Sequence, residues 1–380
     1  MSLLRLRGAK VLRSTKGRKP EKSIVVSFVL LIVTGLVVLF AASFYNAGSK
    51  GSLLTDVISQ LFGIMIGLTF MLILWKVDIS FLSRPVVSGW LLAVSFVLLI
   101  LVAIPGVGVY INGSRRWLRI GPISFQPSEL AKYSLVLFMA RALSSPKRDI
   151  TNFFKGLIPL FIVPGAMFVL ILLQPNLSTA GSIIITSALM TMIAGAKWTH
   201  LALIGVSGLA VGSYYALSEP YRRARMISFI DPFRYLSNEG YQLAQSLMAF
   251  GSGGLFGMGL GRGKQKYSFL PYPESDFIFA IVGEDMGYVG CILVMALFMA
   301  FLFFGYRISV REKDRFKSML SAGIVSTIGV QTILNIAVVI GVMPTTGLPL
   351  PFFSAGGTSV SIVMGAVGIL FNISSEQNPL

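Results

Sequence analysis

An acidic residue, Asp276, lies between a glycine-rich segment that carries cations and a strongly apolar run. Residues 251–263 contain seven glycines in thirteen positions, so we expect a mobile loop there rather than a helix interior. If the apolar run enters a membrane, a carboxylate at its edge costs free energy and is a functional candidate. A carboxylate at a water–membrane border can take a proton from an attacking hydroxyl, so Asp276 is the candidate general base.

A second set of charged residues lies inside apolar runs. Glu129 and Lys132 are three residues apart, so their side chains share one helix face. They either form an ion pair that allows the helix to insert, or line a polar cavity open to a substrate. The same choice applies to Glu284 and Asp285, where flanking glycines favour the interpretation of close helix packing.

The elements that position these residues follow from composition. Hydrophobic residues make up 54% of the 380 positions and charged residues only 12%, and the mean hydropathy is +0.79. These values indicate an integral membrane protein. The net charge of +17 comes mostly from short loops between apolar runs, which is typical of membrane topology and does not indicate nucleic acid binding. A single cysteine and a single histidine argue against a disulfide framework or a metal cluster of these ligands.

A membrane span needs roughly 20 apolar residues. The sequence predicts an all-α polytopic membrane protein with about ten transmembrane helices and one long extracytoplasmic loop. The expected spans are Ile24–Phe44, Leu53–Trp75, Val86–Ile104, Pro127–Leu143, Leu157–Leu173, Thr179–Ala196, Thr199–Leu217, Phe277–Tyr306, Met319–Met343 and Phe352–Ile373.

Lysine and arginine near the span ends predict the orientation. Residues 1–22 form a basic tail, which we expect to be cytoplasmic and to touch anionic lipid or a cytoplasmic partner. The tail does not have the pattern of a cleaved signal peptide. An even number of spans within residues 23–374 returns residues 375–380 to the cytoplasm, and it puts the loop at residues 218–276 outside.

Two outer loops, residues 105–125 and 218–275, contain more lysine and arginine than is usual for loops on the outer side of a membrane. Ten cations there stand against four carboxylates, which favours an anionic ligand over a merely solvated surface. Within the second loop, residues 240–250 have the spacing of a short interfacial helix. The cations are Arg115, Arg116, Arg119, Arg222, Arg223, Arg225, Arg234, Arg262, Lys264 and Lys266.

Four segments together resemble one family, the bacterial SEDS peptidoglycan glycosyltransferases. They are NGSRRWLRIGPISFQPSELAK at residues 112–132, QPNLSTA at 174–180, YQLAQSLMAFGSGGLFGMGLGRGKQKYSFLPYPESDFIFAIVGEDMG at 241–287 and MPTTGLPLPFFSAGGTS at 343–359. The PTTGLPLPF form and the basic tail are more similar to the division branch of the family than to the elongation branch. The chain departs from the family pattern at Asn176, Ser178 and Glu274.

The resemblance implies polymerisation of lipid II at the outer face of the cytoplasmic membrane. It also implies partnership with a class B penicillin-binding protein, a transpeptidase, and with other membrane proteins of division or elongation. The family's catalytic carboxylate maps to Asp276 and its cavity pair to Glu129 and Lys132. Arg116 and Arg119 lie in the family's basic segment, and Lys266 is a further candidate for substrate binding.

Such a reaction would invert the anomeric centre and release a lipid pyrophosphate. Lys132, the outer arginines or a divalent cation, Mg²⁺ or Mn²⁺, would stabilise that leaving group. Three alternatives stay open: a flippase for lipid-linked precursors, an elongation-type enzyme of the same family, and a non-catalytic scaffold for division proteins. The scaffold leaves Asp276 and the Glu129–Lys132 pair without a role.

Overall fold

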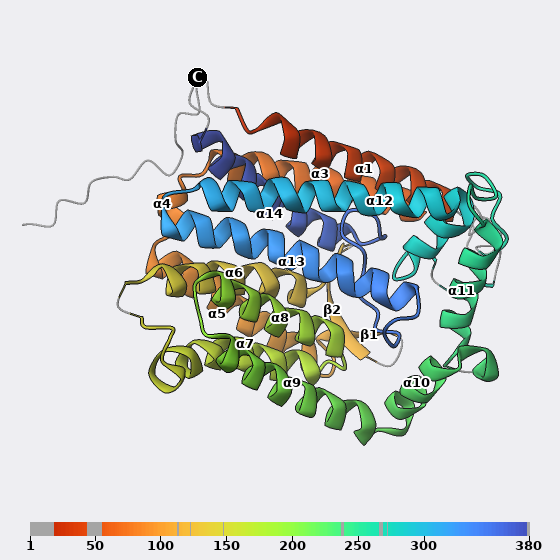
Figure 1. Cartoon of the computed structure of the whole chain (residues 1–380), viewed down its shortest axis with the longest axis horizontal. Coiled ribbons are helices and arrows are strands. Elements are labelled where there is room, and N and C mark those ends of the chain that lie inside the picture. The colour runs from red at the N-terminus through yellow and green to blue at the C-terminus, as the bar shows by residue number, and fades with distance from the viewer. Residues whose placement is uncertain are drawn as a thin grey trace, which may run out of the picture.

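The computed structural model describes residues 19–43, 55–111, 114–121, 123–146, 148–236, 239–265, 269–271 and 273–377. Long helices run roughly side by side, while α10, α11 and the strands gather towards one end (Figure 1). The elements are α1 (Lys22–Ser43), α3 (Thr55–Lys76), α4 (Ile79–Leu82), α5 (Pro85–Ala103), β1 (Gly108–Ile111), β2 (Ser114–Ile120), β3 (Ile123–Phe125), α6 (Pro127–Ser144), η1 (Phe153–Leu157), α7 (Ile158–Leu172), α8 (Leu177–Ile193), α9 (Trp198–Ser218), α10 (Pro220–Ile230), η2 (Pro232–Tyr235), α11 (Tyr241–Gly253), α12 (Ile278–Arg311), α13 (Arg315–Val339) and α14 (Gly357–Gln377).

Each of the ten predicted spans coincides with a helix: α1, α3, α5, α6, α7, α8, α9, α12, α13 and α14. Within the described part of the chain, seven helical stretches are long and apolar enough to cross a membrane on their own composition. Of the others, α6 carries three charged residues and α8 has 17 residues. Large apolar side chains such as Met65, Trp90 and Leu209 are exposed on outer faces, which suits contact with lipid. The prediction of an all-α polytopic membrane protein is confirmed.

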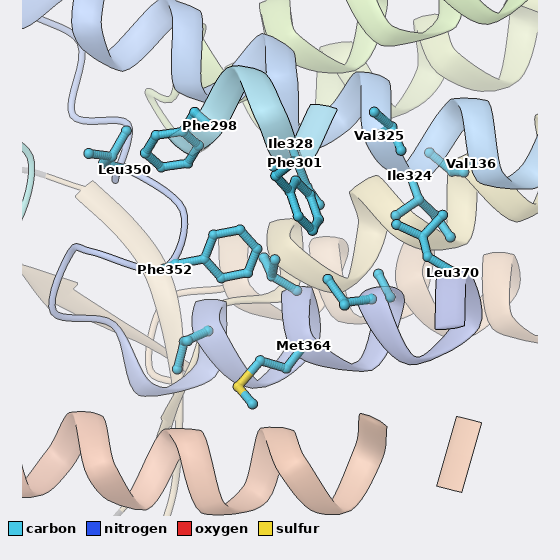
Figure 2. Close-up of a cluster of buried hydrophobic side chains, with 14 of the residues drawn as sticks. Val136, Phe298, Phe301, Ile324, Val325, Ile328, Leu350, Phe352, Met364 and Leu370 are labelled. Atoms are coloured by element: carbon cyan, nitrogen blue, oxygen red, sulfur yellow. The ribbon is translucent and has the colours of Figure 1, made fainter. Parts of the chain in front are cut away.

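Helix α13 lies at the centre of the bundle, packed against α6, α8, α12 and α14. Most of its side chains are buried, polar ones included. A close-up shows apolar side chains from several of these helices converging with the segment that precedes α14 (Figure 2). They are Val136 of α6, Phe298 and Phe301 of α12, Ile324, Val325 and Ile328 of α13, Leu350 and Phe352 before α14, and Met364 and Leu370 of α14.

The start of α1 and the end of α14 lie at the same end of the bundle. The backbone N–H of Glu21 donates to Ser374 Oγ at 2.9 Å, and the Glu21 carboxylate pairs with Arg307 near the end of α12. Lys317 at the start of α13 pairs with Glu376. These contacts agree with an even number of crossings.

Residues 108–125 form a three-stranded antiparallel sheet in the order β1-β2-β3, between α5 and α6. The pairing shifts register between Val109–Trp117 and Tyr110–Arg115, which leaves Arg116 as an extra residue in β2. Such a bulge redirects a side chain and often occurs near active sites. From the sequence this stretch is expected to be a loop, so the sheet is a difference from the prediction.

Residues 340–356 join α13 to α14 without forming a helix, and this linker is longer than the span boundaries predicted. It nevertheless passes through the protein interior, because Leu348, Leu350, Phe352 and Phe353 are all buried. Phe352 has φ of 68°, an unusual value for a bulky residue. Its ring packs edge-on against Phe28 and Phe301, with centroids 5.7 Å away in both cases. Non-helical backbone is tolerated at membrane depth where protein surrounds it.

Candidate active site

Asp276 lies two residues before α12, at the end of the bundle opposite the start of α1 and the end of α14. Its side chain is partly exposed and accepts a hydrogen bond from Ser275 Oγ at 3.1 Å. The Asp276 carbonyl accepts from Asn335 Nδ2 of α13 at 2.8 Å, and the Ser275 carbonyl accepts from Ser354 Oγ at 2.6 Å. The backbone that carries the carboxylate is therefore fixed by α13 and by the 340–356 linker.

Two guanidinium groups act on Asp276. Both Asp276 and Arg116 lie close to the linker backbone at Gly347, where φ is 75°. A Cβ atom at this position would lie 3.3 Å from Asp276 Oδ2 and 3.8 Å from Arg116 Nη1, so the absence of a side chain at Gly347 leaves room for both groups. Although the residue is partly exposed, the loss of water around its carboxyl group raises the pKa of Asp276 above its ordinary value. The Ser275 hydrogen bond and the charges of Arg116 and Arg225 offset part of that rise. A carboxyl group with a raised pKa suits proton transfer near neutral pH better than an ordinary one does.

Arg116 reaches this position from the bulge in β2. It donates from Nε to the Gln174 carbonyl at 3.2 Å and from Nη2 to the Pro175 carbonyl. The sheet is thereby tied to the α7–α8 connection. Arg119, further along β2, is exposed, and no contact within the described part of the chain brings it to Asp276. Lys266, the other predicted binding residue, lies outside the described residues.

Glu129 and Lys132 form a buried network inside the bundle. Lys132 Nζ lies 2.9 Å from Glu129 Oε1 and donates to Gln331 Oε1 of α13 at 2.5 Å. Ser359 Oγ of α14 donates to Glu129 Oε2 at 2.8 Å, and Gln331 Nε2 donates to the Pro349 carbonyl at 2.8 Å. The pair thus joins α6 to α13, to α14 and to the 340–356 linker.

The cavity beside Lys132 is small, with a volume of about 10 Å³ between α6, α8 and α13. That space holds about one water molecule. Lys132 and Glu129 are 3% and 1% exposed, so a pyrophosphate can reach Lys132 only if these helices separate. In this structure the pair is linked to Asp276 through the 340–356 linker. Gln331, which binds Lys132, also binds the Pro349 carbonyl of that linker. Asn335, which binds the Asp276 carbonyl, donates to the neighbouring Leu348 carbonyl at 2.6 Å.

The glycine-rich segment is anchored, which differs from the mobile loop that its composition predicted. Two carboxylates of α12 accept hydrogen bonds from its backbone. Gly261 and Gly263 donate to Asp285 at 2.9 and 3.1 Å, while Lys264 and Gln265 donate to Glu284 Oε1, the latter at 2.9 Å. Backbone N–H groups that converge on a buried carboxylate give a loop one preferred conformation.

Glu284 and Asp285 therefore do more than the sequence analysis assigned to them. The predicted close packing is present, because a Cβ at Gly283 would lie 2.3 Å from the Phe250 ring of α11. The α12 backbone also turns sharply two residues later, at Gly287, where φ is 67° and ψ is −166°. The two carboxylates thus lie at a kink, and the straight part of the helix that follows, roughly 24 residues or about 36 Å long, is sufficient to span a membrane.

Asn176 and Ser178, which depart from the family pattern, both have structural partners here. Asn176 caps α8 by accepting from the Thr179 N–H at 3.2 Å. Ser178 Oγ donates to the Thr346 carbonyl of the 340–356 linker at 3.1 Å. Asn176 therefore helps to start α8, and Ser178 helps to position the linker relative to α8.

Four residues that the sequence does not single out also lie in this region: Arg225, Gln331, Asn335 and Ser359. Gln331 and Asn335 carry a recognisable signal, because they are polar, four residues apart and surrounded by apolar residues in a predicted span. Arg225 is one of many outer cations, and its position relative to Asp276 depends on how the outer segments fold.

The described residues around Asp276 do not form a preformed cage of protein ligands for a Mg²⁺ or Mn²⁺ ion. In the described part of the chain, no group of three or more histidine, cysteine, aspartate or glutamate side chains is arranged to hold a metal. The groups that act on Asp276 include two cations, whereas Mg²⁺ sites use carboxylate, carbonyl and water oxygens.

Known proteins with similar sequences cover almost the whole chain. A sequence profile described as cell cycle protein, which groups FtsW, RodA and SpoVE, matches residues 21–379. Stage V sporulation protein E of Bacillus subtilis is 39% identical over 362 residues, covering 95% of this chain and 98% of that protein. A protein of Saccharophagus degradans named probable peptidoglycan glycosyltransferase FtsW is 36% identical over 365 residues, covering 95% and 94%.

Solved structures with the same fold also exist. One chain comes from work described as the structural coordination of polymerization and crosslinking by a peptidoglycan synthase complex. It aligns with a TM-score of 0.76 and 25% identity over 94% of this chain and 98% of that chain. The rod shape determining protein RodA of Thermus thermophilus aligns with a TM-score of 0.64 and 25% identity over 94% and 97%.

Proposed function

The chain belongs to the FtsW/RodA/SpoVE family of cell cycle proteins, and we propose that it is a peptidoglycan glycosyltransferase that polymerises lipid II. The observation that carries the proposal is the setting of Asp276. The pKa of its carboxyl group is raised, the charges of Arg116 and Arg225 act on that group, and its backbone carbonyl is bound by Asn335 at one end of a membrane bundle. That arrangement suits a reaction between a sugar hydroxyl and a membrane-held phosphate ester.

Asp276 acts as the general base. An acceptor sugar hydroxyl gives its proton to the Asp276 carboxylate while its oxygen forms a bond to the anomeric carbon of the donor. The bond from that carbon to the pyrophosphate oxygen breaks, and both of its electrons leave with the lipid pyrophosphate. Attack from the face opposite the leaving group inverts the anomeric centre. The proton passes from Asp276 to solvent before the next cycle.

Cations near Asp276 stabilise the charge that develops on the leaving pyrophosphate. Arg225 of α10 and Arg116 of β2 are the first candidates, since the charges of both act on Asp276. Arg262 and Lys264 project from the segment that Glu284 and Asp285 anchor, and Lys266 and Arg119 follow as outer cations. Lys132 supports the site from inside the bundle through Gln331, and its direct contact with substrate is a prediction that depends on helix separation.

We further propose a place for the reaction in the cell. The basic residues 1–22 and the basic connections at the terminal end favour cytoplasmic termini in a bacterial inner membrane. Asp276 then faces the outer side, where a class B penicillin-binding protein would crosslink the new strands. The sequence features favour a role in septal wall synthesis, with elongation or sporulation as the alternative for a chain whose relatives include SpoVE and RodA.

The test is lipid II polymerisation by purified protein with its transpeptidase partner, whose crosslinking is blocked. Asp276→Asn keeps the shape of the side chain but removes most of its basicity, so turnover should fall by roughly a hundredfold or more. Substrate binding and thermal stability should stay close to those of the wild type. Asp231→Asn, at an exposed carboxylate that caps η2, serves as the matched control.

If the Asp276→Asn variant polymerised lipid II at the wild-type rate, Asp276 would have no catalytic role. Transport of lipid II between leaflets by the same variant, measured in vesicles, would then favour the flippase.

A further inference from the structure

A second polar site lies at the terminal end of the bundle, away from Asp276. A cavity of about 430 Å³ opens there between the α4–α5 junction, the last turns of α6 and the start of α13. Two guanidinium groups contribute to its lining. The lining residues are Ser83, Phe138, Arg141, Ala142, Ser144, Ser145, Arg148 and Phe316.

Neither guanidinium group is neutralised within the described part of the chain. Arg141 and Arg148 form no described ion pair there, and the Nη1 atom of Arg148 is buried without a hydrogen-bond partner. The nearby carboxylates are engaged elsewhere. Asp149 accepts from the Thr151 hydroxyl and N–H at 2.6 and 3.0 Å, and Asp314 caps α13.

A structural explanation accounts for only one of the two arginines. Arg141 is in the last turn of α6, where a cation interacts favourably with the carbonyl end of the helix. Arg148 lies beyond the helix, and nothing in the described chain satisfies its buried donor. Burying such a donor without a partner costs free energy, and that cost is removed if the side chain turns towards the cavity that it lines and a ligand there supplies an acceptor.

The surroundings indicate what the ligand is. Phe138, Ala142 and Phe316 give the cavity an apolar wall. Helix α5 starts two residues after Ser83 and exposes Val86 and Trp90 on its outer surface, at 63% and 70%. Tryptophan is typical of the membrane–water interface. The cavity is therefore lined by two cations and lies close to a surface suited to acyl chains.

We propose that this cavity binds the phosphate of an anionic glycerophospholipid headgroup. Arg141 and Arg148 donate charge-assisted hydrogen bonds to the phosphate oxygens, as basic pockets between membrane helices do elsewhere. The Ser145 hydroxyl lies beside them as a further donor. The glycerol and acyl chains continue over the apolar wall towards α5. The site links lipid composition to the packing of α6 against α13, which holds the Lys132–Gln331 contact.

Native mass spectrometry of the delipidated full chain in detergent tests the proposal. Phosphatidylglycerol should bind at least about tenfold more tightly than phosphatidylcholine. Arg148→Gln and Arg141→Gln should each weaken phosphatidylglycerol binding by about fivefold to tenfold. Arg84→Gln is the matched control, because Arg84 is an exposed cation at the same end that lies over the Phe81 ring, and its effect should stay within twofold.

Several results would overturn the proposal. Equal affinity of the wild type for the two lipids, or unchanged binding after Arg148→Gln, excludes the site. Displacement of phosphatidylglycerol by an equal concentration of inorganic phosphate identifies a free anion as the occupant and excludes the lipid. Arg148→Lys keeps the charge and should retain most of the binding. Because Arg148 satisfies no protein group, a Gln variant that failed to fold would also contradict the argument.

Discussion

At the scale of the residue, Asp276 combines two opposing influences. Burial raises its pKa, and Arg116, Arg225 and the Ser275 hydroxyl lower it. A general base works only when deprotonated, so the rate should fall as the pH drops through the pKa of Asp276. Each cation near the carboxylate therefore extends activity towards lower pH.

Arg225→Gln tests this balance. Loss of the cation lets the pKa of Asp276 rise further, so the acid limb of the pH–rate profile should move to higher pH. The measurement is the initial rate of glycan formation between about pH 5.5 and pH 9 with saturating lipid II. Arg225→Lys retains a positive charge and should leave the limb near its wild-type position. A limb that did not move in the Gln variant would show that Asp276 does not set it.

A second substitution at Glu129 can distinguish a structural role of Lys132 from direct contact with the substrate. Lys132→Met leaves the Glu129 carboxylate buried without its cation, which should cost about 3–5 kcal/mol of stability. The double variant Glu129→Gln with Lys132→Met removes both charges and leaves an acceptor for Ser359. If Lys132 only positions α13, the double variant should recover both melting temperature and much of the polymerisation rate. If Lys132 contacts the pyrophosphate, stability returns while activity stays low.

At the scale of the element, the segment anchored on Glu284 and Asp285 shows how α12 orders the outer loop. Asp285→Asn replaces one carboxylate oxygen with an N–H donor, so Gly261 or Gly263 loses its acceptor. We expect faster amide hydrogen exchange in residues 259–265. Polymerisation should be roughly tenfold slower, although the Asp276 side chain itself is not altered. Glu219→Gln, at an exposed carboxylate before α10, should change neither quantity. Unaltered exchange in the Asp285 variant would contradict the anchoring role.

The kink in α12 provides a test of stability. Gly287 has φ of 67°, and a Cβ there would lie 2.3 Å from the Gly257 nitrogen. Gly287→Ala should therefore lower stability by at least about 1–2 kcal/mol from backbone conformation alone, with the clash in addition. The matched change is Gly208→Ala in α9, where nothing lies within 4 Å of the added atom. Thermal unfolding in detergent should show a clearly lower melting temperature for Gly287→Ala than for Gly208→Ala.

Elements that form from local sequence could be predicted, and those that depend on distant contacts could not. Runs of apolar residues are sufficient to locate the ten helices, and the spacing of residues 240–250 is sufficient for α11. The kink at Gly287 requires contact with Gly257 and Leu255. The buried linker requires Gln331 and Asn335 to bind its carbonyls. The bulge that directs Arg116 depends on pairing with β1.

The sequence points to Asp276 as a candidate, but it does not predict the contacts around this residue. A carboxylate beside an apolar run identifies Asp276 from the sequence. The cation that acts with Arg116 on Asp276 is Arg225, about fifty residues away along the chain, and one cation among ten in two outer loops cannot be distinguished without the fold. From the sequence, Lys132 either pairs with Glu129 or lines a cavity open to substrate; in the structure it contacts Glu129, Gln331 and a cavity of about one water, and its contact with substrate stays a prediction.

At the scale of the whole molecule, the chain separates two polar regions at opposite ends of the bundle. In Figure 1 the C-terminus and α4 lie at the left, while α10, α11 and the strands lie towards the right. The first end carries the start of α1, the end of α14 and the cavity with Arg141 and Arg148. The other end carries Asp276. Because the fold fixes these ends relative to each other, one measurement of sidedness assigns both sites to a face of the membrane.

Cysteine labelling in intact cells makes that assignment. Cys291, the single native cysteine, is buried in α12 and can be replaced by alanine. In that background, Arg223→Cys on the exposed side of α10 should react with a membrane-impermeant maleimide, and Lys313→Cys before α13 should react only after permeabilisation. The reason is that an excess of lysine and arginine retains the terminal end in the cytoplasm. The reverse pattern would place Asp276 on the cytoplasmic side, where the proposed polymerisation at the outer face could not occur.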